Sequence, residues 1–581
     1  MNRFDFLLFL ALFFFLSPCS QAQYTTNNTP NSFFGDRGEV YFRFSGTSAS
    51  EINRLSHIIS VDKISDQNVF AYANKKEFEN FLKEDIPFTI LTAPGLLIPE
   101  KELQHRIPVV KSGNMIIWDF YPTYQEYVAY MVGFAASHPD ICKLDTIGTS
   151  IQDRLLLAVK ISDHVNQHEA EPGLFFTSSI HGDETTGYVL MLHLIDYLIS
   201  NYGIDARITD MINSTEIFIN PLANPDGTYY GGDQSPYGAT RNNINNIDLN
   251  RNFPDPKFGL HPDGENWQKE TQAFMNYPDL NHFTMSANLH GGSEVFNYPW
   301  DTWMKLTADD TWWQWVGREW ADTSQKYGPT GYFTDMNNGI TNGYSWYEIN
   351  GGRQDYMNYW QHCREVTVEI SDIKLLPVNL LETMWISNYH SFLDFIEQSH
   401  NGITGTVTDS VTGNPLCAKI FLNGHDMDSS EMFSKLPSGF YSRPVSEGIY
   451  SITFSAPGYF PKTVDQVEVH NNQAISLNVS LKQNPFSIND KEIQSLRIFP
   501  NPGNGVFEIE LPANDQNTPK IMVFNALGNE VFTGESKPSS SASRYILNIF
   551  HLPSGIYILK IITGEVTLTR KLIIGHQRDA G

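Results

Sequence analysis

Two side chains in this chain of 581 residues, His181 and Glu184, have the types and the spacing that suit a metal ion. They lie three residues apart in "SSIHGDETTGYVLMLHLIDYL", so both point to the same side of a turn that enters a helix. Imidazole and carboxylate groups are zinc ligands, and a catalytic zinc site leaves one position open for water. The same spacing occurs at two other places, His168/Glu171 and His362/Glu365.

The surroundings of His181 favour it over the other two pairs. It directly follows an apolar strand, "GLFFTSS", and precedes a long amphipathic helix; the carboxyl end of a parallel strand exposes such side chains to a crevice. His290 also ends an apolar strand, "TMSANLH", and the two glycines after it let a substrate approach closely. The sequence therefore predicts a metal site made of His181, Glu184 and His290.

Residues 115–400 must position these side chains. Segments with helical periodicity alternate there with short apolar strands, for example "LLLAVKI", "EIFINPL" and "VTVEI". This alternation predicts an α/β domain with a mixed, mainly parallel sheet flanked by helices. Residues 38–95 read as strand–helix–strand–helix–strand, a small α/β module that ends near Pro94–Gly95. That module is either a pro-domain, inhibitory or chaperoning, or an accessory domain.

Two small β-sandwich domains are expected after residue 400. Over residues 402–482, apolar and polar residues alternate around Gly, Asn and Pro turns. A polar linker at Gln483–Glu492 precedes the second sandwich, residues 493–575.

Charge and the first residues indicate the compartment. The net charge is −26, which repels a phosphate backbone, so we expect no nucleic-acid partner. Residues 1–22 have the pattern of a secretory signal peptide, with an apolar run too short to span a bilayer and cleavage expected after Ala22; "LSPC" within it is a weak lipoprotein signal. No later apolar stretch approaches 18 residues, so no transmembrane segment is expected.

Five motifs occur in the order of a known family. They are "HGDETTG", "RNNINNIDLNRNFPD", "SANLHGG", "GGRQDYMNYW" and "EVTVEIS". Over about residues 115–482 the sequence resembles the zinc metallocarboxypeptidases of the N/E/D branch, which carry a transthyretin-like sandwich after the catalytic domain. The resemblance implies the zinc carboxypeptidase fold and one Zn²⁺ per catalytic domain, held by His181, Glu184 and His290.

The resemblance also implies a role for each further site residue. Glu369 would be the general base and acid, and Arg241 would stabilise the tetrahedral oxyanion. Asn250, Arg251 and Tyr356 would bind the terminal carboxylate of a peptide or protein substrate. Asp248 would orient a zinc-bound imidazole, that of His181.

Specificity depends on Asp301, eleven residues after His290 in "NYPWD". In members of the branch that prefer basic residues, an Asp at this place meets a substrate Lys or Arg, so the resemblance implies removal of a C-terminal Arg or Lys. The alternative is that Asp301 is a turn residue before "TWMK", and the Trp-rich segment from Pro299 to Tyr332 does not align with the family residue by residue.

Residues 493–575 resemble the C-terminal sorting domain of the type IX secretion system, with "FPNPGNG", "NALGNEV" and "LPSGIYILKI". This implies the type IX machinery as a partner, and release or attachment at the cell surface. Two other function classes stay open: a zinc amidase or deacylase on the same scaffold, and a non-catalytic surface binding protein. An amidase needs no carboxylate clamp, and a binding shell needs neither the metal ligands nor Glu369.

Overall fold

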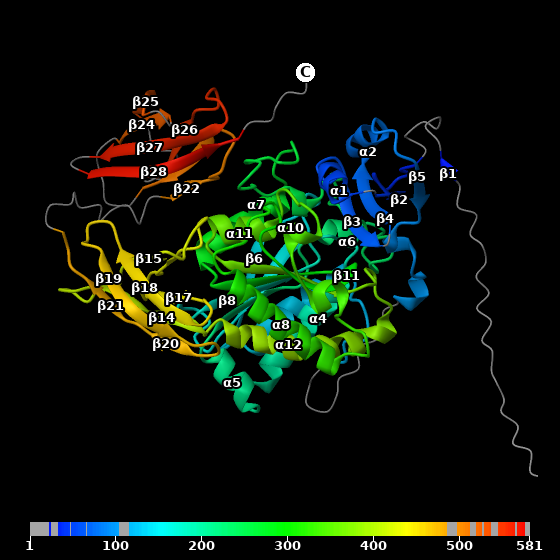
Figure 1. Cartoon of the computed structure of the whole chain (residues 1–581), viewed down its shortest axis with the longest axis horizontal. Helices are drawn as coiled ribbons and strands as arrows, with labels where there is room; N and C mark the ends of the chain where they lie inside the picture. The colour runs from blue at the N-terminus through cyan, green and yellow to red at the C-terminus, as the bar shows by residue number, and fades with distance from the viewer. Residues whose placement is uncertain are drawn as a thin grey trace, which may run out of the picture.

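The computed structural model describes residues 23–24, 33–46, 48–65, 67–103, 116–484, 497–511, 519–525, 528–535, 544–563 and 566–575. Four bodies follow one another along the chain: an N-terminal module, a large α/β domain and two β-sandwiches (Figure 1). The module lies at one end of the large domain, and the sandwiches lie at the other. The predicted signal peptide lies outside the described residues.

The large domain is built on an eight-stranded sheet in the order β12-β11-β13-β10-β8-β9-β7-β6. Its strands are β6 (Cys142–Thr149), β7 (Leu155–Ile161), β8 (Gly173–Ser178), β9 (Glu216–Asn220), β10 (Met285–His290), β11 (Ser293–Tyr298), β12 (Ile340–Asn342) and β13 (Arg364–Ser371). The central strands β13, β10, β8 and β9 run parallel, while β11, β7 and β6 join antiparallel. The predicted mixed sheet is confirmed, and its parallel centre brings several strand ends to one edge.

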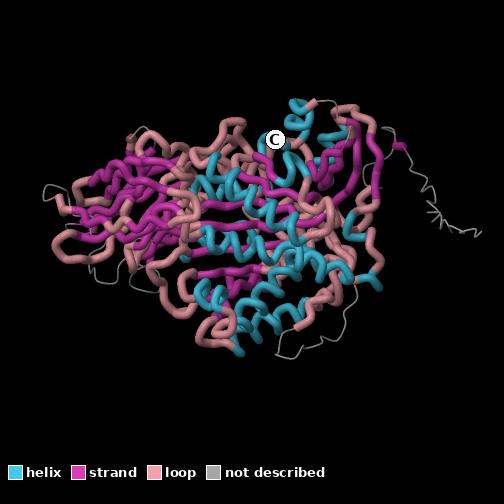
Figure 2. The backbone as a smooth tube through the Cα atoms, turned by 60° about the horizontal axis from the view of Figure 1, so that its bottom comes forward, coloured by secondary structure: helices cyan, strands magenta, loops and turns pink. Residues whose placement is uncertain are grey.

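Helices cover both faces of this sheet (Figure 2). Phe176 of β8 belongs to the larger core and its neighbour Phe175 to the smaller, because successive strand residues point to opposite faces. The larger core is formed with α3 (Tyr124–Ser137), α4 (Thr186–Asn201), α5 (Ala206–Ile212), α8 (Asp310–Tyr327) and α12 (Leu381–Gln398). The smaller core is formed with α7 (Lys269–Asn281) and α11 (Arg353–Trp360). Short helical turns complete the domain: α6 (Pro225–Thr228), α9 (Asp335–Gly339) and α10 (Gly343–Trp346).

The N-terminal module is a five-stranded antiparallel sheet in the order β1-β5-β2-β4-β3, with two helices on one face. Its elements are β1 (Gln23–Tyr24), β2 (Glu39–Ser45), α1 (Ala49–Leu55), β3 (Ser60–Ser65), β4 (Asn68–Asn74), α2 (Lys75–Leu82) and β5 (Phe88–Leu91). Asn74 and Glu77 form a reciprocal cap that starts α2. Strand β3 was not expected from the sequence, because "SVDKIS" is short and mostly polar.

The domain after residue 400 is a sandwich of two four-stranded sheets. Its strands are β14 (Gly402–Asp409), β15 (Lys419–Leu422), β16 (Met432–Phe433), β17 (Phe440–Arg443), β18 (Gly448–Ser455), β19 (Lys462–Val469), β20 (Ala474–Ser476) and β21 (Val479–Leu481). A buried ion network joins it to the large domain. Arg443 pairs with Asp426 at 2.5 Å and with Asp309 at 2.9 Å, and Asp309 pairs with Arg364 of β13 at 2.9 Å.

The last domain has a three-stranded and a four-stranded sheet around a core of its own. Its strands are β22 (Arg497–Phe499), β23 (Val506–Glu510), β24 (Lys520–Asn525), β25 (Glu530–Glu535), β26 (Arg544–Asn548), β27 (Gly555–Thr563) and β28 (Val566–Ile574). Across the described ranges of the chain, none of the helices combines the length and apolar character that crossing a bilayer requires.

Candidate metal centre and substrate pocket

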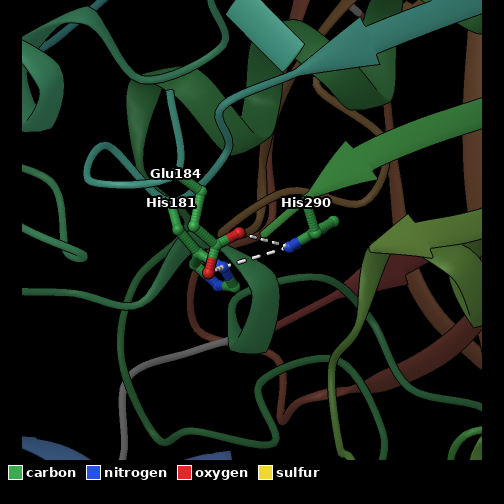
Figure 3. Close-up of side chains that lie close together, drawn as sticks. All are labelled: His181, Glu184 and His290. Carbon is green, nitrogen blue, oxygen red and sulfur yellow. Dashed lines mark hydrogen bonds and ion pairs between the residues drawn. The ribbon is translucent and has the colours of Figure 1, made fainter. Parts of the chain in front are cut away.

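His181, Glu184 and His290 converge at the carboxyl edge of the parallel strands (Figure 3). His181 Nδ1 lies 3.0 Å from Glu184 Oε1, His290 Nδ1 lies 2.9 Å from Glu184 Oε2, and the two Nδ1 atoms are 3.1 Å apart. Zinc ligands at about 2.1 Å in a tetrahedron are roughly 3.4 Å from one another, so the three side chains are set close to ligand spacing. Between the first two ligands, only glycine fits at position 182, where a Cβ would lie 2.3 Å from the backbone of Gly227.

The charges of these ligands also suit a metal. Burial lowers the pKa of His290 to about 4, so its imidazole is neutral, the form that binds a metal. Burial opposes ionisation of Glu184, but His181, Lys374 and His290 hold its pKa well below the usual value. Two imidazoles and one carboxylate, all buried, fit a zinc ion.

Asp248 lies behind the first ligand, as the sequence predicts. Its Oδ1 is 3.1 Å from His181 Nε2, the ring atom opposite the proposed metal-binding nitrogen. Its Oδ2 accepts a hydrogen bond from Arg241 Nε at 3.0 Å. Although Asp248 is buried, Arg241 and His181 hold its pKa well below the usual value. The carboxylate is therefore ionised and positioned to fix the His181 ring.

Glu369 enters the site from β13. It stands opposite His290 in the parallel register of β10 and β13, which places this carboxylate at the candidate metal centre. Burial, reinforced by the charge of Glu184, raises the pKa of Glu369 well above its usual value. Its Oε2 is buried and has no hydrogen-bond partner among the described residues. A carboxyl group in this state is suited to take up and return a proton.

Arg251 follows Asn250 in a short 3-10 turn that opens with Asp248, whose side chain accepts from Asn250 N at 2.9 Å. The guanidinium donates through Nη1 to Asn250 O, also at 2.9 Å. Its Nε and Nη2 are buried and find no acceptor within the described ranges. Both residues line the same pocket as the metal centre. A buried guanidinium with two unused donors is set to receive a carboxylate.

Asp301 lines this pocket too, as predicted, and its side chain is buried. Asn297, which the sequence analysis missed, donates through Nδ2 to Asp301 Oδ1 at 3.2 Å, while its own Oδ1 is buried without a partner in the part of the chain that is described. Burial raises the pKa of Asp301 to about 7, against the opposing effects of Asn297 and Arg251. Two clustered acceptors suit a donor-rich cation.

The prediction for Tyr356 is corrected by its position. Its side chain packs in the smaller core against Phe253 and Trp360, and its hydroxyl accepts from Gln361 Nε2 at 2.8 Å. The tyrosine that lines the pocket is Tyr347, four residues before Gly351. Many aromatic residues lie between 344 and 360, and Tyr347 and Tyr356 flank the same glycine pair, Gly351–Gly352. The sequence therefore did not show which of the two tyrosines lines the pocket.

Lys374 is another residue of the site that the sequence analysis missed. Its Nζ lies 2.6 Å from Glu184 Oε1, and the side chain is buried. The only signal was a lysine five residues after Glu369 within an apolar run, "IKLLP". The other residues predicted for the site, apart from Tyr356, are brought together with Asn297, Tyr347 and Lys374.

Comparison with known proteins agrees with this geometry. Residues 127–391 match the zinc carboxypeptidase family, and residues 497–575 match the secretion system C-terminal sorting domain. The human carboxypeptidase N catalytic chain is 36% identical over 366 residues, covering 56% of this chain and 78% of that protein. Mouse carboxypeptidase M is 34% identical over 391 residues, covering 64% of this chain and 84% of that protein. The chain belongs to the zinc carboxypeptidase family, and it ends in a sorting domain of the type IX class.

Carboxypeptidase D of Anas platyrhynchos is 34% identical over 431 residues, which cover 70% of this chain. The match covers only 30% of that relative, so the chain spans less than a third of its length. Among solved structures, carboxypeptidase A of Helicoverpa armigera has a TM-score of 0.48 and 18% identity, covering 61% of this chain and 96% of that one.

Proposed function

We propose that this chain is a zinc-dependent exopeptidase that removes a C-terminal Arg or Lys from peptides or proteins. Two sets of unpaired polar atoms in one pocket carry the proposal: the guanidinium donors Nε and Nη2 of Arg251, and the Oδ1 acceptor of Asn297, which lies beside the carboxylate of Asp301. A free C-terminal carboxylate satisfies the first, and a cationic side chain satisfies the second. An amidase substrate satisfies only one of them.

Zinc, when bound by His181, Glu184 and His290, would polarise the carbonyl of the scissile bond and lower the pKa of a water molecule. Glu369 would take a proton from the water that attacks the peptide bond and return it to the nitrogen of the leaving amino acid. Arg241, which lines the pocket beside the ligands, donates to the oxygen that gains charge. Together, Asn250, Arg251 and Tyr347 hold the terminal carboxylate. Asp248 keeps the His181 ring in its ligand orientation.

We further propose that the protein is exported and reaches the cell surface or the medium through the type IX machinery. The sorting-domain match over residues 497–575 supports this route. The signal-peptide pattern of residues 1–22 fits the first export step.

The test is product identity. The full chain is incubated with peptides that differ only in a C-terminal Arg, Lys or Phe, with and without a zinc chelator, and the products are weighed. We expect loss of a single Arg or Lys, abolished by the chelator and by Glu369→Gln. Cleavage inside the peptide, or activity that survives the chelator, contradicts the proposal. Release of Phe at the same rate as Arg would support an exopeptidase but contradict the role of Asp301 in selecting a basic residue.

A further inference from the structure

Buried polar side chains lead away from the metal centre along the middle of the large sheet. Ser286, Asn288 and His290 alternate along β10, so all three point to one face. Thr177 of β8 lies opposite Asn288, and it shares its face with Phe175, which belongs to the smaller core. The centre of a parallel sheet covered by helices is usually filled with apolar side chains. Polar residues at this depth therefore call for a specific role.

Asn288 connects the third metal ligand to these residues. Its Nδ2 lies 2.9 Å from His290 Nε2, while Nδ1 of the same ring faces Glu184. The Asn288 Oδ1 accepts a hydrogen bond from Thr177 Oγ1 at 3.0 Å. All four side chains are buried. Because the amide is bonded at both ends, it cannot turn away from the ring without losing Thr177.

The Asn288 amide suits the His290 ring in either tautomer. When Nδ1 binds a metal, the neutral imidazole carries its proton on Nε2, which then needs an acceptor. A carboxamide has an acceptor at one end and donors at the other, and the Thr177 hydroxyl can donate or accept. The same two contacts therefore serve the ring whether or not Nε2 carries a proton.

Arg353 of α11 holds the far end of this chain of contacts. Its Nη1 donates to Thr177 Oγ1 at 2.5 Å, and its Nη2 lies 3.0 Å from Glu365 Oε2 on β13. The guanidinium is fully buried, 5.3 Å from the ring centroid of Phe175 and 5.1 Å from that of Phe274. A buried ion pair adds little net stability over apolar side chains of the same volume. Stability alone therefore does not account for a guanidinium here.

The backbone of Arg353 also reaches the other side of the pocket. Its N–H donates to Asn250 Oδ1 at 2.9 Å, and Asn250 is one of the residues proposed to hold the terminal carboxylate. The first residue of α11 thus lies between the metal ligands and the carboxylate site, and touches neither metal nor substrate itself.

We propose that Arg353 is a positioning residue of the metal centre, which acts through Thr177 and Asn288 to fix the ring of His290 as a ligand. The inference rests on the proposed zinc site, but not on which peptide is cleaved. Asp248 holds the far nitrogen of His181 directly with a carboxylate. Asn288 does the same for the second imidazole with a neutral amide that Thr177 and Arg353 keep in place. Loss of such an outer partner typically weakens metal binding by 10–100-fold.

The test measures the zinc dissociation constant of the full chain by competition with a chelating dye. Thr177→Val removes the hydroxyl that joins Arg353 to Asn288 and keeps the shape of the side chain. We expect this constant to rise at least about tenfold in Thr177→Val and in Arg353→Met, and to change less than about threefold in Thr177→Ser, which keeps the hydroxyl. The control is Thr215→Val, which should match the unaltered chain. Thr215 is equally buried, and its hydroxyl lies 2.7 Å from His400 Nε2, outside the pocket.

The outcomes separate this inference from the exopeptidase. Weaker zinc binding in Thr177→Val, restored in Thr177→Ser, supports the inference even if no variant cleaves a peptide, a result that would overturn the exopeptidase. Zinc binding as tight in Thr177→Val as in the unaltered chain, or equally weakened in Thr177→Ser, overturns the inference and leaves the exopeptidase. An unaltered chain that binds no zinc overturns both. Circular dichroism checks folding, and Thr177→Val carries the test if Arg353→Met, which leaves Glu365 without its cation, does not fold.

Discussion

Replacing Asp301 by Asn removes one charge from the pocket without changing its shape. The Asp301 side chain is buried, and its Oδ1 already accepts from Asn297 Nδ2 at 3.2 Å, so Asn can occupy the same space. A hydrogen bond between a buried carboxylate and a cation contributes about 1.5–3 kcal/mol. A guanidinium that bridges Asp301 and Asn297 would lose about 3 kcal/mol, which is on the order of 100-fold in kcat/KM.

The assay measures kcat/KM for two peptides that differ only in a C-terminal Arg or Phe, with the unaltered chain and with Asp301→Asn. We expect Asp301→Asn to lower the value for Arg on the order of 100-fold and to leave that for Phe within about threefold. Asp322→Asn, on an exposed carboxylate of α8, is the control and should change neither value. An equal fall for both peptides would show that Asp301 supports the fold of the pocket, which would refute the reasoning.

Three further outcomes are expected. Because burial raises the pKa of Asp301 to about 7, its carboxyl group is protonated below that pH and cannot attract a cation. KM for the Arg peptide should therefore rise as the pH falls from about 8 to about 6, while KM for the Phe peptide stays level. Asp301→Asn should remove this difference between the two peptides. Arg251→Lys keeps the charge but loses the planar donors, so KM for any free-acid peptide should rise at least about tenfold in titrations of initial rate; an unchanged KM would place the carboxylate elsewhere. Arg443→Leu leaves Asp309 and Asp426 without a shared cation, so calorimetry should show a free energy of unfolding lower by about 3–5 kcal/mol. Lys269→Ala, which breaks an exposed pair with Asp153, is the control and should lower it by less than about 1 kcal/mol.

The candidate metal ligands could be predicted from sequence because strand ends determine their positions. His181 follows β8 and His290 ends β10, and adjacent parallel strands bring their carboxyl ends to one edge. The role of Glu369 is implied by the family resemblance, and its position fits that role, because Glu369 stands opposite His290 in the register of β10 and β13. The local sequence pattern was therefore sufficient for residues whose positions follow from the end of their own strand.

The remainder of the site depends on contacts between distant segments. Asp62 of β3 lines the pocket and pairs with Lys374, more than three hundred residues away in sequence, from a bulge in a strand that the sequence pattern did not indicate. Asn297 becomes notable only because its Oδ1 is left without a partner in the described structure. Tyr347 and Tyr356 differ in sequence by nine positions, but only packing shows that one lines the pocket and the other fills a core.

The most direct test of the central claim is a pair of peptides with the same sequence and a C-terminal Arg, one with a free carboxylate and the other amidated. Both are incubated with the zinc-loaded full chain, and the products are weighed over time. The account predicts loss of one Arg from the free acid and at least about a hundredfold slower change in the amide, because only the carboxylate satisfies the unused donors of Arg251. Equal processing of the two peptides would contradict it.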